Sequence, residues 1–98
     1  MARAVSSSIP QVRSCGNMFL CCCYIANIED IETCDDAWKK SVQNGWVRSD
    51  CYCNVSRYNL ANKLNEIYGR GIKQGLSFIN DGQGNWSLYN GKNRVYCP

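Results

Sequence analysis

The sequence has 98 residues and a net charge of +3, and 45% of its residues are hydrophobic. These values indicate one domain with a small core, and they exclude a disordered chain. The sequence contains no histidine, which excludes Ser-His-Asp, Cys-His and two-histidine acid/base mechanisms. It contains no dense run of Lys and Arg and no nucleic-acid-binding motif, so we expect no nucleic-acid partner.

Residues 1–14 are small and polar, and Pro10 interrupts them. We predict that they form a flexible N-terminal arm before a single domain over residues 15–98. The first six residues lack the apolar stretch of a signal peptide, and no apolar run approaches the ~20 residues of a membrane-spanning helix. We therefore expect a mature secreted, extracellular protein from which a signal peptide has been removed.

Eight cysteines are the strongest signal, and three of them, Cys21–Cys23, are contiguous. An even number of cysteines in a short extracellular chain indicates a disulfide framework. Zinc is the alternative, but contiguous cysteines are poorly spaced for one ion, so we expect neither a metal nor another cofactor. We predict four intramolecular disulfides, with the pairing left open, among Cys15, Cys21, Cys22, Cys23, Cys34, Cys51, Cys53 and Cys97.

The segment Asn17–Ile25 is apolar and aromatic without helical spacing, which favours a buried strand. On such a strand Cys21 and Cys23 would share one face, and Cys22 would take the other.

Residues 28–45 are predicted to form the first helix, with Thr33 as its N-cap and Gly45 as its terminator. Helical spacing predicts a buried stripe of Cys34, Ala37, Trp38, Ser41 and Val42. From this stripe we expect Cys34 to bond to a strand cysteine, one of Cys21, Cys23, Cys51 and Cys53. The acidic residues 29–36 suit the positive end of the helix dipole, so we interpret them as a helix start and predict no enzymatic activity.

Residues 46–55 alternate, which predicts a strand whose cysteine face looks at the helices. The opposite face carries Trp46, Arg48 and Tyr52, with Arg57 beside it. Because Trp, Tyr and Arg dominate binding hot spots, these four residues are the candidate binding surface. The alternative interpretation is that they only cover the sheet. The basic residues Lys63, Arg70 and Lys73 are the next candidate surface.

The rest of the chain indicates a second helix and three strands. Ser56 is the expected N-cap of a helix whose apolar stripe includes Leu60 and Leu64 and which Gly69 or Gly71 ends. Three strands then follow over residues 76–80, 85–89 and 94–97, joined by hairpin turns. Asn54 and Asn85 begin N-glycosylation sequons and are candidate acceptors.

These elements give the order β-α-β-α-β-β-β. The predicted fold class is α+β: a monomeric, disulfide-stabilised two-layer α/β sandwich in which an antiparallel sheet carries two helices on one face.

Two parts of the sequence resemble a known group, the killer-toxin-like small secreted cysteine-rich fungal effectors. Cys51-Tyr52-Cys53-Asn54-Val55, the helix after it and Gly84-Asn85-Trp86-Ser87-Leu88-Tyr89 are similar to the strand, helix and Trp-x-x-Tyr ending of fungal necrosis-inducing effector domains. Cys21 and Cys23, followed by Thr33 and Cys34, are similar to the start of smut-virus killer toxin subunits.

The resemblance implies an α/β sandwich, secretion, and toxicity or virulence toward a competing microbe or a plant host. It supplies no catalytic residue. The expected function is that of a secreted fungal virulence effector that binds a host or competitor protein, glycan or membrane component. The alternatives are an antimicrobial killer toxin that acts on membranes or ion channels, and a carbohydrate-binding module that uses exposed Trp and Tyr.

Overall fold

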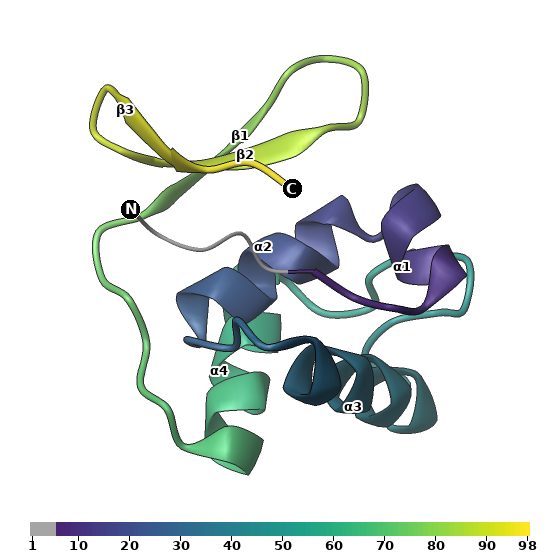
Figure 1. Ribbon diagram of the computed structural model, residues 1–98. Coiled ribbons are helices and arrows are strands. Elements are labelled where there is room, and N and C mark those ends of the chain that lie inside the picture. Colours follow the sequence, from purple (N-terminus) through teal and green to yellow (C-terminus); the bar gives the residue numbers. More distant parts are fainter. Residues whose placement is uncertain (1–5) are drawn as a thin grey trace.

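Helices occupy the first part of the chain and strands the last part (Figure 1). The computed structural model describes residues 6–98. Within that range the helices are α1 (Pro10–Cys15), α2 (Asn17–Ile25), α3 (Ile31–Gln43) and α4 (Arg57–Tyr68). The strands are β1 (Ser77–Asn80), β2 (Trp86–Asn90) and β3 (Asn93–Tyr96). The α+β class with an antiparallel sheet is thereby confirmed.

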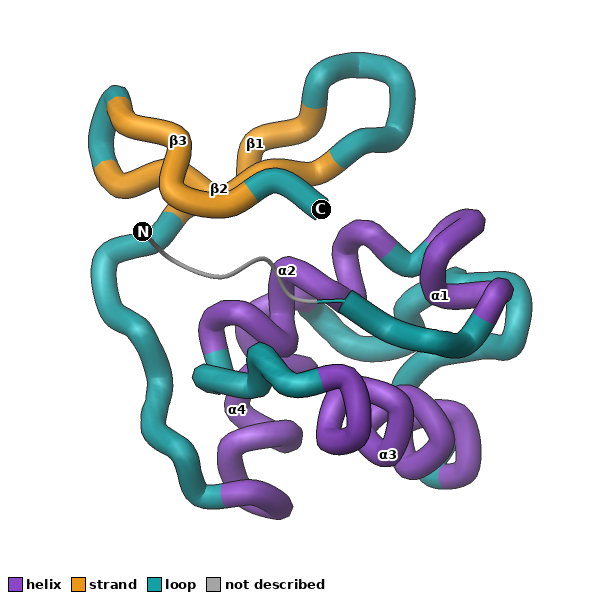
Figure 2. The backbone as a smooth tube through the Cα atoms, viewed as in Figure 1, coloured by secondary structure: helices purple, strands orange, loops and turns teal. Residues whose placement is uncertain are grey.

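Helix α2 lies between the sheet and the other helices (Figures 1 and 2). It packs against α1, α3 and α4 and, on another side, against β2. Every residue from Phe19 to Ile25 is buried. The core of the protein is therefore built around α2.

The predicted strand over Asn17–Ile25 is wrong, because this segment is α2. An apolar run without periodicity suits a helix buried on all sides as well as it suits a buried strand. Gly16 marks the junction with α1. A Cβ atom there would lie 2.7 Å from the carbonyl oxygen of Val12, so only glycine lets the two helices meet this closely.

Lys73 closes the C-terminal end of α2. Its ammonium group donates to the carbonyl oxygen of Tyr24 at 2.8 Å and lies 4.2 Å from the centroid of that ring. Its backbone N–H donates to the carbonyl oxygen of Ile25 at 2.8 Å. A cation at a helix C-terminus is favourable because the helix dipole is negative there. The long connection from α4 to β1 therefore stabilises α2 as it passes (Figure 2).

The other two long helices form where the sequence predicts them. In α3 the buried residues are Cys34, Ala37, Trp38 and Ser41, as expected, but the N-cap is Asp30. Thr33 donates its backbone N–H to the Asp30 side chain at 3.1 Å, which is the role of the third helical residue and not of the cap.

Helix α4 matches its prediction at both ends. Ser56 is the N-cap, and its hydroxyl accepts from the backbone N–H of Asn59 at 3.4 Å. Gly69 ends the helix with a φ of 64°, in the left-handed region that favours glycine. The buried residues are Leu60, Ala61 and Leu64.

The predicted strand over residues 46–55 is also wrong. The chain turns back within it, and the only ladder contact among these residues is an isolated bridge between Val47 and Cys53. Asp50 makes the turn: its carboxylate accepts from the backbone N–H of Tyr52 at 3.2 Å. Aspartate side chains stabilise turns in this way, and here that local bond outweighs the alternating pattern.

The three-strand meander is confirmed, with the order β1-β2-β3 and antiparallel pairing throughout. Leu88 of β2 is fully buried, and Tyr96 of β3 stacks on Tyr24 of α2 with ring centroids 4.6 Å apart. The predicted sandwich, with two helices laid directly on the sheet, is therefore incorrect. Helix α2 is the main helical neighbour of the sheet, α3 lies beyond it, and α4 meets the sheet through its first residues, Arg57 and Tyr58 (Figure 1).

The predicted N-terminal arm is only partly described, because residues 1–5 lie outside the described range. Its last residues belong to α1, in which Val12 is buried. Within residues 6–98, no helix has the length and apolar character needed to cross a bilayer.

Asp30 joins the start of α3 to the end of α4. Its carboxylate pairs with the guanidinium of Arg70 at 2.7 Å and accepts from the Thr33 hydroxyl at 2.5 Å. Arg70 also donates to that hydroxyl at 3.0 Å. The hydrogen bonds from Thr33 and Arg70 hold the pKa of Asp30 well below its usual range.

Leu64→Ala should lower the free energy of unfolding by about 2–5 kcal/mol, because it removes a fully buried side chain and leaves a cavity. Ile67→Ala is the matched control on the same helix. Ile67 is 38% exposed, so its truncation should cost clearly less. Urea unfolding of both variants checks this, and equal losses would contradict the assigned inner face of α4.

Asp30→Asn should make stability less dependent on pH. A carboxyl whose pKa is lowered on folding adds stability above its unfolded pKa of about 3.9, and this stability is lost as the pH falls through the folded value. Asparagine keeps the N-cap but not the ion pair with Arg70. Wild type should exceed the variant by about 0.2–1 kcal/mol at pH 7. In urea unfolding the gap should narrow progressively as the pH falls below about 4, whereas a constant gap would contradict the ion pair's role.

Candidate binding surface

A disulfide between Cys15 and Cys51 anchors the turn that carries the candidate binding residues. It joins the end of α1 to residue 51, with Cα atoms 5.9 Å apart. Cys51 has a φ of 75°, a conformation that is uncommon for a residue with a side chain. The turn also has backbone hydrogen bonds from Arg48 to Tyr52 at 2.8 Å and from Asn54 to Trp46 at 2.9 Å. The turn is thus fixed at several points.

Tyr52 and Arg48 project from this turn as a pair. The Arg48 guanidinium lies 5.4 Å from the centroid of the Tyr52 ring and pairs with the Asp50 carboxylate at 2.7 Å. Tyr52 is 62% exposed, the highest value among the exposed large hydrophobic residues of the described chain. An aromatic ring held in place yet uncovered is typical of a binding surface, since the core does not use it.

A groove of about 350 Å³ runs beside this pair. We call it the disulfide groove. Its walls come from the start of α2, the Cys15–Cys51 bond, the segment leading into α4 and the start of β2. It is lined by Cys15, Asn17, Met18, Cys51, Tyr52, Cys53, Val55, Ser56, Arg57, Gly84 and Trp86.

Arg57 lines this groove, and its side chain has a structural role. Its guanidinium lies 4.5 Å from the centroid of the Trp86 ring and 5.3 Å from that of Phe78. Its Nε atom is buried with no hydrogen-bond partner. Arginine stacks on aromatic faces through its planar group, so Arg57 ties α4 to the sheet.

Trp46 is not part of the groove. It is half-buried, and the ammonium of Lys63 lies 5.3 Å from its ring centroid. The structure therefore brings Arg48 and Tyr52 together, places Tyr52 and Arg57 in one groove, and separates Trp46 from them. The sequence prediction missed Met18 and Trp86, because it drew the candidate surface from residues 46–57 alone.

The second basic surface is also not assembled. Lys63 lies on Trp46, Arg70 pairs with Asp30, and Lys73 closes α2. Each of these cations already has a partner within the fold, so they do not form a shared free patch.

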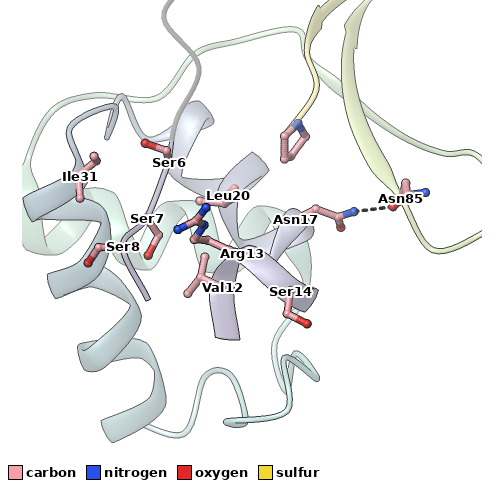
Figure 3. Close-up of a pocket in the computed structure, with 11 residues that line it drawn as sticks. Ser6, Ser7, Ser8, Val12, Arg13, Ser14, Asn17, Leu20, Ile31 and Asn85 are labelled. Atoms are coloured by element: carbon pink, nitrogen blue, oxygen red, sulfur yellow. Dashed lines mark hydrogen bonds between the residues drawn. The ribbon is translucent and has the colours of Figure 1, made fainter. Parts of the chain in front are cut away.

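A larger hollow of about 630 Å³ lies at the other side of α2 and is lined by several serines (Figure 3). Asp35 of α3 accepts hydrogen bonds from two of these serines, Ser7 and Ser8. The Ser7 hydroxyl donates to that carboxylate at 2.5 Å, and Ser8 donates both its hydroxyl and its backbone N–H. Burial acts to raise the pKa of Asp35, but these bonds outweigh it and the pKa is lowered. The serines therefore fix the residues before α1 onto α3.

The two sequon asparagines are exposed, and both use their side-chain nitrogen. Asn54 donates to the carbonyl oxygen of Gly45 at 2.9 Å, and Asn85 donates to the Asp81 carboxylate at 3.0 Å. Asn85 also accepts from Asn17 at 3.2 Å (Figure 3). A glycan on Asn85 would have to replace bonds that shape the β1–β2 turn.

The other six cysteines carry thiols, and those of Cys23 and Cys34 lie 3.7 Å apart. Over residues 6–98, no three side chains among His, Cys, Asp and Glu converge as they would around a metal ion. Comparison of the chain with protein-family models, with curated proteins and with solved structures gives no match.

Arg57→Ala should lower the free energy of unfolding by about 1–2 kcal/mol, because it removes the stacking on Trp86 and the packing of the arginine stem. Tyr52→Ala should change it by less than about 0.5 kcal/mol, since most of that ring is exposed. Urea unfolding measures both. A large loss for Tyr52→Ala would show that the ring supports the fold and would remove it from the binding surface.

Proposed function

We propose that this protein is a secreted fungal virulence effector that acts by binding a host or competitor target and not by catalysis. The fungal origin, the secretion and the effector role rest on the resemblance described above. The disulfide is compatible with an oxidising compartment such as the extracellular space.

The observation that carries the binding mode is the exposed Arg48–Tyr52 pair on an anchored turn. The Cys15–Cys51 bond and the backbone bonds restrain the turn before any partner arrives, the ion pair with Asp50 orients Arg48, and the Arg48 guanidinium lies over the Tyr52 ring. A restrained surface loses little conformational entropy on binding, which raises affinity. The partner we propose is a protein whose side chain enters the disulfide groove while its backbone covers Tyr52.

Aromatic stacking supports a protein partner over a glycan. The Trp86 ring in the groove already carries the Arg57 guanidinium on one face, so it is not a free platform for a sugar. Tyr52 is exposed, so its ring can contact a partner at the edge of the groove. A ring and an arginine beside a groove are the combination that protein hot spots favour.

Tyr52→Ala and Arg48→Ala should weaken the response of host leaves to infiltrated protein and leave the melting temperature nearly unchanged. Truncating a hot-spot residue costs at least ~2 kcal/mol, which corresponds to roughly 30-fold in affinity. The protein concentration for half-maximal response should rise by about this factor. Lys92→Ala, at an exposed position outside the groove, is the control and should retain full activity.

Folded Tyr52→Ala and Arg48→Ala proteins with full activity would refute this surface. Dye release from liposomes by the wild-type protein would support the membrane-active toxin in place of the effector. Specific retention on a glycan array, lost in Tyr52→Ala, would support the carbohydrate-binding module.

A further inference from the structure

The three contiguous cysteines of α2 point in three different directions. Consecutive residues of an α-helix are rotated by about 100°, so their side chains leave the helix on separate sides. Residues four apart lie on the same side. The residues one turn before Cys21, Cys22 and Cys23 are Asn17, Met18 and Phe19, and they show what each side of α2 faces.

The side that carries Phe19 and Cys23 faces α3. The Phe19 ring meets the Trp38 ring edge-on, with centroids 5.2 Å apart. One turn before Trp38 on α3 is Cys34, and its sulfur lies 3.7 Å from that of Cys23. Both thiols are fully buried. Phe19 and Cys23 of α2 thus face Trp38 and Cys34 of α3, ring against ring and thiol against thiol.

The side that carries Met18 and Cys22 faces the segment leading into α4. Met18 lines the disulfide groove together with Cys53 and Arg57. The Cys22 thiol donates to the carbonyl oxygen of Arg57 at 3.3 Å, so its buried sulfur lies beside the backbone of a groove residue. Cys53 is the groove cysteine that the Cys15–Cys51 bond leaves unused.

The side that carries Asn17 and Cys21 faces the C-terminal end of the chain. The Cys21 thiol donates to the carbonyl oxygen of Trp86 at 3.6 Å. A hollow beside Trp86 is lined by Asn17, Cys97 and Pro98. Cys97 follows Tyr96, which the stacking on Tyr24 holds against α2. The last cysteine therefore lies near the side of α2 from which Cys21 projects.

We propose that the six remaining cysteines form three disulfides, Cys21–Cys97, Cys22–Cys53 and Cys23–Cys34. Together with Cys15–Cys51, these bonds use all eight cysteines. Six cysteines allow 15 pairings. The directions of the α2 side chains select one of them, because no two cysteines of α2 face the same neighbour.

The electrostatics of the thiols agree with this pairing. Burial and then the neighbouring Cys97 raise the pKa of the Cys21 thiol to about 12. Burial and then Cys53 raise the pKa of Cys22 well above its usual range. For Cys23, burial and then Cys34 do the same. In each case the cysteine with the largest effect is the proposed partner.

Each bond forms by a balanced two-electron step. Two thiols lose two protons and two electrons, and a sulfur–sulfur bond forms between them. The oxidant is a disulfide such as oxidised glutathione, whose own sulfur–sulfur bond breaks and whose two sulfurs leave as thiols with those protons. Buried thiols of high pKa react slowly, so we expect these bonds to close while the chain is still folding.

The first test maps the disulfides of the wild-type protein after refolding with reduced and oxidised glutathione. Cleavage after Leu20, Tyr24, Trp46, Tyr52 and Tyr58 places Cys15, the triple cysteine, Cys34, Cys51, Cys53 and Cys97 on six separate peptides. Mass spectrometry without reduction should find one species that joins the Cys15 and Cys51 peptides. It should find a second species that joins the triple-cysteine peptide to three others, which carry Cys34, Cys53 and Cys97. Free thiols, or a bond between any two of those three peptides, would overturn the proposal.

Fragmentation of the second species then assigns each bond without any variant. Backbone cleavage between Cys21 and Cys22 should leave the Cys97 peptide on the Cys21 fragment. Cleavage between Cys22 and Cys23 should leave the Cys34 peptide on the Cys23 fragment. Any other distribution would overturn the pairing.

Paired substitutions provide an independent test, read from the intact mass after alkylation in denaturant without reductant. The matched variant Cys21→Ser/Cys97→Ser should take up no label, because only a complete bond is lost. The mismatched control Cys21→Ser/Cys53→Ser should take up two labels, at Cys97 and Cys22. No label on the mismatched variant would mean that these two cysteines can pair, which would contradict their positions on different sides of α2.

Discussion

The burial of residues Phe19–Ile25 of α2 is the constraint on which the rest of this structure depends. The backbone N–H and C=O groups within a helix bond to one another, so a helix can lie inside a core. Its side chains must then be apolar, and other parts of the chain must cover its two ends. In α2 the residues Phe19–Ile25 meet the first condition. Gly16 meets the second at the N-terminal end by allowing close contact with α1, and Lys73 meets it at the other end.

The position of α2 determines how the other elements are arranged. Helices α3 and α4 cover it on one side and the meander covers it on another, so the sheet and the outer helices share a core through α2. The stack of Tyr24 and Tyr96 fixes the last strand, and the contact of Phe19 with Trp38 fixes α3. Aromatic pairs of this kind stabilise a core beyond the area that they bury, because the rings attract each other in stacked and edge-to-face arrangements.

The same arrangement separates structural from exposed aromatic residues. Arg57 and Trp86 connect α4 to the sheet, so their contact stabilises the fold. Tyr52 and Arg48 lie on a turn that a disulfide and local hydrogen bonds hold without help from these side chains. A small protein that acts by binding needs such residues, whose loss leaves the core intact.

The sequence predicts α3, α4 and the meander correctly because each has one buried and one exposed side, which leaves a periodic pattern. It fails at α2 for the opposite reason: a segment buried on every side has no pattern, and strand and helix cannot be told apart. It fails at residues 46–55 because local hydrogen bonds, among them the one from the Tyr52 backbone N–H to Asp50, fold the chain back, and alternation does not reveal them.

The difference between the predicted and the observed backbone at residues 17–25 and 46–55 matters most for the cysteines and the binding surface. On a strand, Cys21–Cys23 would face two directions, and on a helix they face three. The predicted surface was drawn on one face of a strand, so it grouped Trp46 with Tyr52, which the turn separates. The selection of Arg48 and Tyr52 survives the change of backbone, because it also rests on residue type: Trp, Tyr and Arg dominate binding hot spots.

Nuclear magnetic resonance of the oxidised protein tests the central claim, that a buried helix α2 forms the core. The ¹³Cα chemical shifts of residues 18–25 should be helical. The backbone amides of Leu20–Ile25 should exchange with deuterium much more slowly than those of α1, because they open only when most of the protein unfolds. Strand-type shifts, cross-strand contacts to these residues, or amides that exchange as fast as those of α1 would contradict this account.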